Sequence, residues 1–230
     1  MPGTNSKVFF TSDLHFSHIN AVHFHPERLL KFGMTMDEFD ENKQVASAKY
    51  DELLISEWNE KITRQDTVYI LGDVCLGNKE RAQYIVSKLH GRKFLILGNH
   101  DKSMKGLENY FEWVGDIKEA KFTNNQYKYI DPEESFCVEM CHYPLLTWNR
   151  RPHGTVMVHG HVHGVLCDFN KMSNELRVDV GYDAQLSKEC GGFVELEDLY
   201  KFMRAKLGKA GVNKFEDYID WKMKNDGFRM

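Results

Sequence analysis

Residues 155–163 read TVMVHGHVH, an apolar run that ends in three histidines alternating with glycine and valine. Side chains two residues apart in a β-strand point to the same face of the sheet. His159, His161 and His163 would therefore share one face. A row of imidazoles fits either a polar sheet face or a metal site, and the residues after the other apolar runs decide between these two.

Four more apolar runs predict strands, namely KVFFTS (7–12), TVYILG (67–72), KFLILG (93–98) and FCVEMC (136–141). After the five strands come, in order, Asp13-Leu14-His15, Asp73, Asn99-His100-Asp101, His142 and His161-Val162-His163. Asp and Asn often end strands simply as turn residues. Histidine is a weak turn former, yet it stands at four of the five ends. Since ligands of open α/β sheets bind beyond the carboxyl ends of strands, we predict one shared metal site.

Helical patterns lie between and after these strands. Residues 36–61 predict a helix that opens with Thr35 and Glu38 in capping-box spacing, and residues 79–90 predict another, with Gly91 as its C-terminal stop. The tail at about 196–226 predicts two amphipathic helices, broken near Gly208–Gly211, with the second starting at Asn213.

Weaker β signals are LRVDVG (176–181) and a hairpin of EAKFT and QYKYI around Asn124-Asn125. The alternation of strands and helices predicts an α/β layered fold. We expect a single domain over 1–230, with a helical insertion at 16–63 and the C-terminal helices.

Composition and charge argue against several classes of protein. The chain has 230 residues, a net charge of −4 and five cysteines without a C-x-x-C pair, so neither a disulfide framework nor a thiolate zinc site is expected. The lack of a signal-peptide pattern and of apolar segments near ~20 residues predicts a soluble, cytoplasmic protein without a membrane partner. Because the charge is not basic, binding of long nucleic acids is disfavoured.

The inventory of ligand types predicts two metal ions. Seven residues qualify as ligands: Asp13, His15, Asp73, Asn99, His142, His161 and His163. That number exceeds the four ligands of a closed tetrahedral site and suits two ions that share a bridging ligand. Two divalent ions, two carboxylates and a bridging hydroxide leave a formal charge of about +1. Such a cluster favours an anionic substrate, and a phosphate ester fits best.

The motifs D-x-H (13–15), G-D (72–73), G-N-H-D (98–101), the lone His142 and G-H-x-H (160–163) together resemble the calcineurin-like metallophosphoesterases. An H-F-x-H opening and a helix that ends near Trp58-Asn59 are similar to small single-domain phage and bacterial members. The resemblance implies a two-sheet β-sandwich core flanked by helices, in the order αββα. The second motif lacks the arginine of the family's protein Ser/Thr phosphatases, so that class is disfavoured.

The resemblance also implies roles for individual residues. One metal ion would be bound by Asp13, His15 and His163, and the other by Asn99, His142 and His161, with Asp73 bridging them. His100 would face the substrate, to protonate the leaving oxygen or stabilise the phosphoryl group, and Asp101 would orient its ring. Mn²⁺ is favoured, and Fe, Zn²⁺, Ni²⁺ and Co²⁺ also suit mixed nitrogen and oxygen ligands.

Several polar residues remain outside these motifs. His18 is a candidate for substrate binding, and Arg150 and Arg151 could clamp a phosphate, although a solvated loop fits them as well. His23 and His25 are expected in surface or packing positions. We interpret His159 as a packed core histidine, with hydrogen bonding to a metal ligand as the alternative.

These observations predict a dinuclear metal-dependent phosphoesterase. It would hydrolyse a small phosphodiester or phosphomonoester, for example a nucleotide, by in-line attack of metal-bound hydroxide. A nuclease acting on longer nucleic acid and a non-catalytic interaction module on the same fold are the alternatives. The sequence leaves the oligomeric state open.

Overall fold

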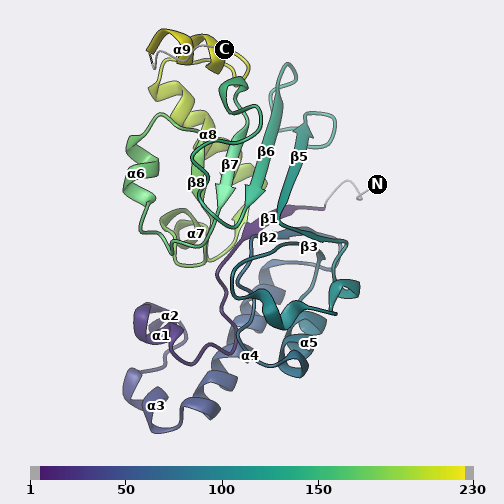
Figure 1. The fold of residues 1–230 in the computed structure, drawn as a ribbon, viewed down its shortest axis with the longest axis vertical. Coiled ribbons are helices and arrows are strands. Elements are labelled where there is room, and N and C mark those ends of the chain that lie inside the picture. Colours follow the sequence, from purple (N-terminus) through teal and green to yellow (C-terminus); the bar gives the residue numbers. More distant parts are fainter. Residues whose placement is uncertain (1–5, 226–230) are drawn as a thin grey trace.

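Two β-sheets that share one hydrophobic core form the centre of the protein (Figure 1), in a computed structural model that describes residues 6–225. The first sheet has the order β4-β3-β2-β1-β9. Its strands β1 to β4 are parallel, and β9 is antiparallel to β1. The bounds are β1 Val8–Thr11, β2 Thr67–Ile70, β3 Arg92–Ile96, β4 Trp113–Gly115 and β9 Val194–Glu195.

The second sheet has the order β5-β6-β7-β8. Strands β6, β7 and β8 are parallel, and β5 is antiparallel to β6. The bounds are β5 Ile117–Thr123, β6 Ser135–Cys141, β7 Val156–His159 and β8 Arg177–Asp179. The five strong strand predictions and the weaker one at 176–181 are therefore confirmed, each within a few residues.

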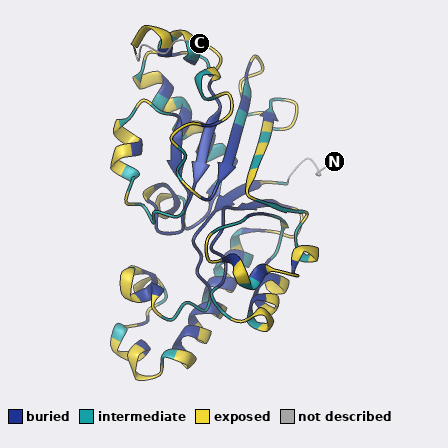
Figure 2. Cartoon of the chain, viewed as in Figure 1, coloured by how far each residue is buried: buried dark blue, intermediate teal, exposed yellow. Residues whose placement is uncertain are grey.

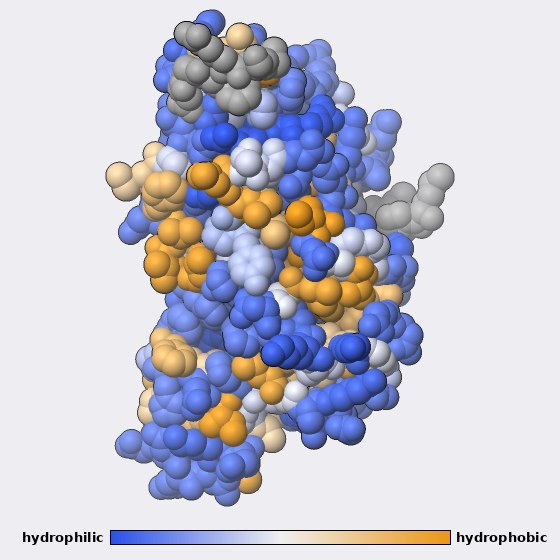
Figure 3. Space-filling view, viewed as in Figure 1, coloured by the Kyte–Doolittle hydropathy of each residue, from blue (hydrophilic) through white to orange (hydrophobic). Residues whose placement is uncertain are grey.

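The alternation of side chains along β1 explains the layers. Phe9 packs into the core beneath α4 (Lys43–Lys61) and α5 (Lys79–Lys88), whereas Phe10 packs between the sheets. Both residues are buried because the sheet is covered on its two faces. Strands β1, β2, β7 and β8 are buried along their whole length, whereas β5 is mostly exposed or half-buried (Figure 2). The end of the molecule that carries α3 (Met36–Glu41) is mainly hydrophilic (Figure 3).

The predicted helix at 36–61 is in fact two helices. The capping box is confirmed, since Glu38 N donates to Thr35 Oγ1 at 3.2 Å and Thr35 N to Glu38 Oε2 at 2.8 Å. Asn42 then leaves the helical conformation, with φ −150° and ψ 82°, and accepts a hydrogen bond from Val45 N to cap α4. Two shorter helices, α1 (Ala21–Phe24) and α2 (Glu27–Lys31), precede this pair.

The predicted hairpin around Asn124-Asn125 is wrong. Strand β5 pairs along its whole length with β6, so QYKYI (126–130) forms turns instead of a strand. Asn124 Nδ2 closes this segment by donating to Ile130 O at 2.6 Å, and Ile130 is fully buried in the core between the sheets. Burial of apolar residues from the loop thus outweighs the local turn signal.

The helix boundaries shift for similar reasons. Helix α5 ends at Lys88, since Leu89 is extended and buried. The break at 208–211 is confirmed, because α8 (Leu196–Lys209) ends there, but the last helix, α9 (Tyr218–Asn225), begins later than Asn213. The segment before α9 inserts Phe215 into the core, and residue 226 lies outside the described residues.

The remaining helices are short. They are α6 Cys167–Met172, α7 Gln185–Glu189, η1 Asp101–Met104, η2 Glu108–Tyr110 and η3 Arg151–His153. Within residues 6–225, no helix combines the length and the apolar character that crossing a membrane requires.

Candidate metal centre

The two sheets meet at the carboxyl ends of their strands, where Ser12 bridges to Gly181. The predicted ligands converge at this junction. Asp13, His15 and His163 form one group whose ligand atoms all lie within 4.8 Å of one another, and Asp13, Asp73 and His142 form a second such group. Residues from β1, β2, β6 and β7 therefore reach one point, as the strand endings predict.

Asp73 lies between the two halves of this cluster. Its Oδ2 is 3.7 Å from His15 Nε2 and 3.6 Å from His142 Nε2. On one side, His15 Nε2 lies 3.1 Å from His163 Nε2. On the other, His142 Nε2 lies 3.0 Å from Asn99 Oδ1, and the His161 ring centroid is 5.0 Å from that of His142. The geometry places Asp73 where a shared ligand would stand.

The backbone of the ligand residues is unusual. Five of the seven predicted ligands have φ between 47° and 71°, namely Asp13, His15, Asp73, His161 and His163. This left-handed conformation costs about 1–3 kcal/mol at each non-glycine residue and persists only where the surroundings enforce it. The loops are thus held in conformations that aim the side chains inward.

Two glycines of the motifs are required by close approach. A Cβ at Gly98 would lie 2.3 Å from Asp73 Oδ1, and a Cβ at Gly160 would lie 2.5 Å from Asp13 Oδ2. Both distances are far below van der Waals contact. The glycines that precede Asn99 and His161 are therefore needed so that the carboxylates of Asp73 and Asp13, both predicted ligands, fit against neighbouring loops.

The electrostatics of the cluster fit a cation. Burial raises the pKa of Asp13 to about 7, and Asp13 Oδ1 has no hydrogen-bond partner within residues 6–225. Burial, reinforced by Arg28 and neighbouring histidines, lowers the pKa of His15 to about 2, which keeps its imidazole neutral. A buried carboxylate oxygen without a hydrogen-bond partner, beside the neutral imidazole of His15, is the kind of donor set that a divalent transition metal accepts.

Asp101 has partners other than the one predicted for it. Its Oδ2 accepts hydrogen bonds from Gly98 N at 2.7 Å and Asp73 N at 2.9 Å, and its Oδ1 accepts one from Val74 N at 2.8 Å. The carboxylate therefore holds the backbone of two ligand loops together, instead of orienting the ring of His100. His100 itself is exposed, and its backbone N donates to Asp73 Oδ1 at 2.8 Å.

A cavity of about 210 Å³ opens beside the first ligand group. Its lining comprises His15, His18, Ala21, Phe24, His25, His100 and His163. His18 thus lies where a substrate could reach it. His25, expected only in a surface or packing position, stacks on the His163 ring at a centroid distance of 4.9 Å. His23 is exposed and lies 3.3 Å from Asp40 Oδ1, away from this cavity.

The structure does not bring Arg150 and Arg151 to the predicted metal ligands. Both precede β7, at its amino end, whereas His161 and His163 follow its carboxyl end. Arg151 forms an ion pair with Glu175, its Nε donating to Oε2 at 2.8 Å. Arg150 lines a separate hollow with Glu119 and Thr155. The direction of β7 thus separates these arginines from the site.

His159 is a fully buried core residue, as interpreted from the sequence. Its Nε2 lies 3.1 Å from Asn170 Nδ2, and its Nδ1 lies 2.9 Å from Gly160 O. Asn170 also accepts a hydrogen bond from Arg177 Nε at 2.9 Å. His159 is thus satisfied by neighbours in the second sheet.

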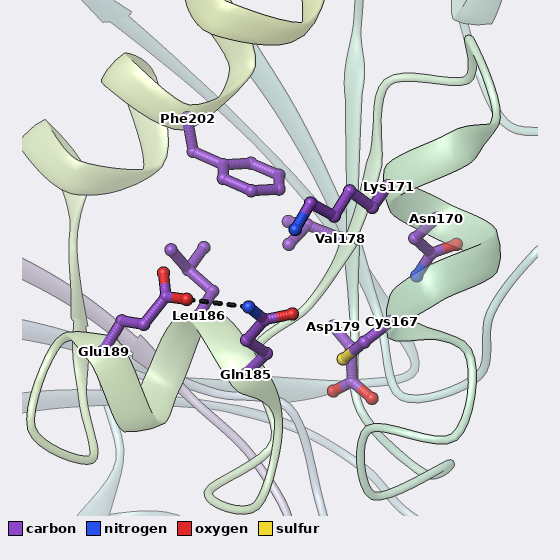
Figure 4. A pocket seen from close by; sticks show the side chains of 9 residues that line it. All are labelled: Cys167, Asn170, Lys171, Val178, Asp179, Gln185, Leu186, Glu189 and Phe202. Carbon is purple, nitrogen blue, oxygen red and sulfur yellow. Dashed lines mark hydrogen bonds between the residues drawn. The ribbon is translucent and has the colours of Figure 1, made fainter.

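A second cavity, of about 190 Å³, lies between α6, α7 and α8 (Figure 4). Apolar side chains of Leu186 and Phe202 line it together with Asp179 and Lys171, and Gln185 donates to Glu189 at 2.8 Å across its edge (Figure 4). The predicted metal ligands do not line this cavity. One lining residue, Asp179, also contacts the loop of the predicted ligand His163, because its Oδ2 accepts a hydrogen bond from Gly164 N at 2.9 Å.

Three residues near the ligands carried no sequence signal: His25, Arg28 and Asp183. Asp183 Oδ2 lies 2.8 Å from His163 Nδ1 and 2.6 Å from Arg28 Nη2. Arg28 and Asp183 are separated by 155 residues, so no local motif could connect them.

Comparison with known proteins identifies the family of this chain. The family model described as calcineurin-like phosphoesterase matches residues 6–187. The chain is 26% identical to the Gene 66 protein of Mycobacterium phage L5 over 227 residues, which covers 90% of this chain and 99% of that protein. It is 27% identical to the Gene 66 protein of Mycobacterium phage D29 over 198 residues, covering 78% of this chain and 89% of that protein.

A solved structure also resembles the fold. The crystal structure of a protein of unknown function from Aquifex aeolicus has a TM-score of 0.55 and 21% sequence identity, and the match covers 86% of this chain and 99% of that one. The likeness shows a shared fold, whereas the family match spans all of the motifs from Asp13 to His163. By that match, this chain belongs to the calcineurin-like phosphoesterases.

Proposed function

We propose that the protein hydrolyses a small phosphodiester or phosphomonoester with the help of two divalent metal ions, Mn²⁺ being the favoured metal. The observation that carries the proposal is the position of Asp73 Oδ2, 3.7 Å from one histidine nitrogen and 3.6 Å from another on opposite sides of the cluster. A carboxylate in that position suits a ligand shared by two ions. When bound, such a pair supplies a nucleophilic oxygen at neutral pH and neutralises phosphoryl charge.

The residues divide into two binding sets. Asp13, His15 and His163 would hold one ion, and Asn99, His142 and His161 the other, with Asp73 between them. The proposal is supported by the short distances inside each set and by Asp13 Oδ1, which has no hydrogen-bond partner among the described residues. Each imidazole would bind in its neutral form.

His100 is proposed as the proton donor to the leaving oxygen. Its ring centroid lies 5.8 Å from that of His15, and its exposed side chain lines the cavity beside the centre. The hydrogen bond from its backbone N to Asp73 Oδ1 holds the residue next to the predicted bridge. A group positioned in this way typically contributes a factor of about 10²–10⁴ to the rate.

The lining of the cavity favours a small substrate. Its seven residues are five histidines, an alanine and a phenylalanine, so this part of the described chain offers no lysine or arginine to track a polymer backbone. Proteins that follow nucleic acid strands rely on a positively charged groove. A nuclease acting on long polymers therefore remains the second candidate.

Hydrolysis of p-nitrophenyl phosphate and bis-p-nitrophenyl phosphate tests the proposal. Metal-stripped protein should gain turnover of one ester when Mn²⁺ is added, and His100→Ala should lose most of it while keeping its metal. His23→Ala is the matched control, because His23 is exposed and lies away from the cavity. Metal uptake without turnover of either ester would indicate a pocket that demands a specific leaving group. Neither turnover nor metal uptake by the unmodified chain would favour the interaction module.

The salt dependence of binding separates small esters from polymers. Binding of a long nucleic acid weakens steeply with salt through counterion release, whereas turnover of a small ester changes little. Strong, salt-sensitive cleavage of single-stranded DNA or RNA would contradict the proposed substrate size and promote the nuclease.

A further inference from the structure

Arg28 and Asp183 form an ion pair beside the centre that nothing in the motifs indicates. Their side chains are each 1% exposed. Arg28 Nε donates to Asp183 Oδ1 at 2.8 Å and Arg28 Nη2 donates to Asp183 Oδ2 at 2.6 Å, which is a bidentate arrangement. We infer that this pair is a positioning device that sets the affinity of one half of the metal centre; the inference rests on the proposed function.

The guanidinium also holds the backbone of the first ligand loop. Arg28 Nη2 donates to Asp13 O at 2.7 Å, and Arg28 Nη1 donates to Leu14 O at 2.9 Å. Asp13 has a left-handed backbone, with φ of 56°, and His15 follows Leu14 directly. Arg28, in α2, thereby fastens a strained loop whose two ligands belong to the same metal-binding set.

Asp183 acts on the third ligand of that set. Its Oδ2 lies 2.8 Å from His163 Nδ1, so a protonated Nδ1 would donate a hydrogen bond to the carboxylate. That arrangement leaves Nε2 as the free lone pair, and Nε2 is the nitrogen that lies 3.1 Å from His15 Nε2. A carboxylate behind a ligating histidine fixes its tautomer and ring orientation and increases its basicity. All three ligands of one set thus depend on one ion pair.

The other half of the centre has a different support. His142 Nδ1 lies 2.6 Å from Leu71 O, a neutral carbonyl. Asp101 holds the backbone around Asp73 and Gly98 through its three hydrogen bonds. Because the hydrogen bonds of the Arg28–Asp183 pair reach the Asp13, His15 and His163 side, its loss should weaken one ion and spare the other.

Titration of the full chain with Mn²⁺ tests this asymmetry. The Asp183→Asn variant keeps the shape of the side chain. Its neutral amide has one acceptor oxygen, so it cannot accept the hydrogen bonds from both Arg28 and His163 that the charged carboxylate accepts. We expect the affinity for one ion to fall about 10–100-fold, as loss of such a partner typically does, and that for the other to stay within about twofold. Electron paramagnetic resonance should show the signal of a coupled Mn²⁺ pair replaced by that of a single ion at intermediate Mn²⁺.

A matched control comes from another buried carboxylate. Glu134 is 1% exposed in its side chain, pairs with Arg204 Nη1 at 2.8 Å and accepts from Tyr200 at 3.0 Å, on the amino side of β6. Glu134→Gln removes a comparable charge far from the centre and should leave both affinities unchanged. Unaltered binding of two ions by Asp183→Asn, or equal weakening of both, overturns the inference.

A measurement on the unmodified chain covers the case in which Asp183→Asn does not fold. With ¹⁵N-labelled histidine and Zn²⁺ bound, nuclear magnetic resonance should find the His163 ring proton on Nδ1, protected by its hydrogen bond to Asp183. A proton on Nε2, or an Nδ1 proton that exchanges freely with water, overturns the inference. Failure of the unmodified chain to take up metal would instead contradict the proposed function itself.

Discussion

Asp51 holds Ser17 with both of its carboxylate oxygens. Ser17 N donates to Asp51 Oδ1 at 2.7 Å, and Ser17 Oγ donates to Asp51 Oδ2 at 2.6 Å. Ser17 stands two residues after His15 and has a left-handed backbone, with φ of 60°. Asp51 is 1% exposed and belongs to α4, so the helix that covers the first sheet also braces the loop that carries the predicted ligands Asp13 and His15.

Replacing Asp51 should therefore destabilise the protein. Asp51→Asn removes the charge that accepts from Ser17 and from Arg81 Nη2 at 2.9 Å. Hydrogen bonds to charged groups contribute about 1.5–3 kcal/mol each, so we expect a loss of a few kcal/mol in the free energy of unfolding, measured in urea. Asp40→Asn, at a side chain 46% exposed, should change it by less than about 0.5 kcal/mol. Equal effects of the two changes would contradict the bracing role.

Substitution by alanine should have opposite effects on stability at Gly98 and at Gly208. Gly98→Ala would place a Cβ 2.3 Å from Asp73 Oδ1, so we expect weaker metal uptake and lower stability. Gly208 lies in α8 with open space where a Cβ would stand, and Gly208→Ala should stabilise by about 0.5–1 kcal/mol through helix propensity. Thermal unfolding with and without Mn²⁺ measures both effects. Normal metal uptake by Gly98→Ala would show that the close approach is not needed.

Phe24 should matter for esters with a planar leaving group. The side chain is 75% exposed and lines the cavity that contains His18 and His100. Stacking of an aromatic group on such a ring is worth about 1–3 kcal/mol, so Phe24→Ala should lower kcat/KM for an aryl or nucleoside ester by roughly 5- to 150-fold. An alkyl phosphate should respond little. Phe169→Ala, at a 58% exposed position on α6, is the control and should respond to neither ester.

Burial of Lys206 should make the free energy of unfolding depend on pH. Its Nζ donates to the carbonyl oxygens of Asn170 and Glu175, and burial lowers its pKa from 10.5 to about 8. Between these two values the unfolded chain binds more protons than the folded one at this residue, so its contribution to the free energy of unfolding rises with pH.

Comparison with Lys206→Met isolates that contribution. Urea unfolding of both proteins at about pH 7 and about pH 9.5 should show the unmodified protein gaining stability relative to the variant at the higher pH. Curves that change in parallel would mean that the lysine titrates at its ordinary pKa in the folded protein.

The candidate metal ligands could be predicted because each lies within a few residues after the end of a strand. Parallel strands bring their carboxyl ends to one edge, so Asp13, Asp73 and His142 were placed together without any knowledge of loop conformation. The absence of a hairpin at Asn124-Asn125 could not be predicted from strand endings. Strand β5 pairs with seven residues of β6, and that pairing depends on the whole length of both strands. Local turn residues carry no information about that pairing.

The partners of long side chains could be identified only in the tertiary structure. Arg151 looked like a phosphate clamp because it lies between two ligand segments in the sequence, but the direction of β7 turns it toward Glu175. His25 and Arg28 come from a helical segment without a motif, and both reach the first ligand set. Their roles follow from how that segment packs on the sheets.

The strands, the candidate ligand types and the family can be predicted from the sequence because they depend on local order, which is an apolar run followed by Asp, Asn or His. The contacts that hold the candidate ligands in place depend on tertiary packing. Asp51, Asp101 and Asp183 are buried, and a buried carboxylate must find hydrogen-bond donors wherever packing provides them. Those donors, at Ser17, Asp73 and Arg28, are contributed by segments far away along the chain, so folding alone brings each pair together.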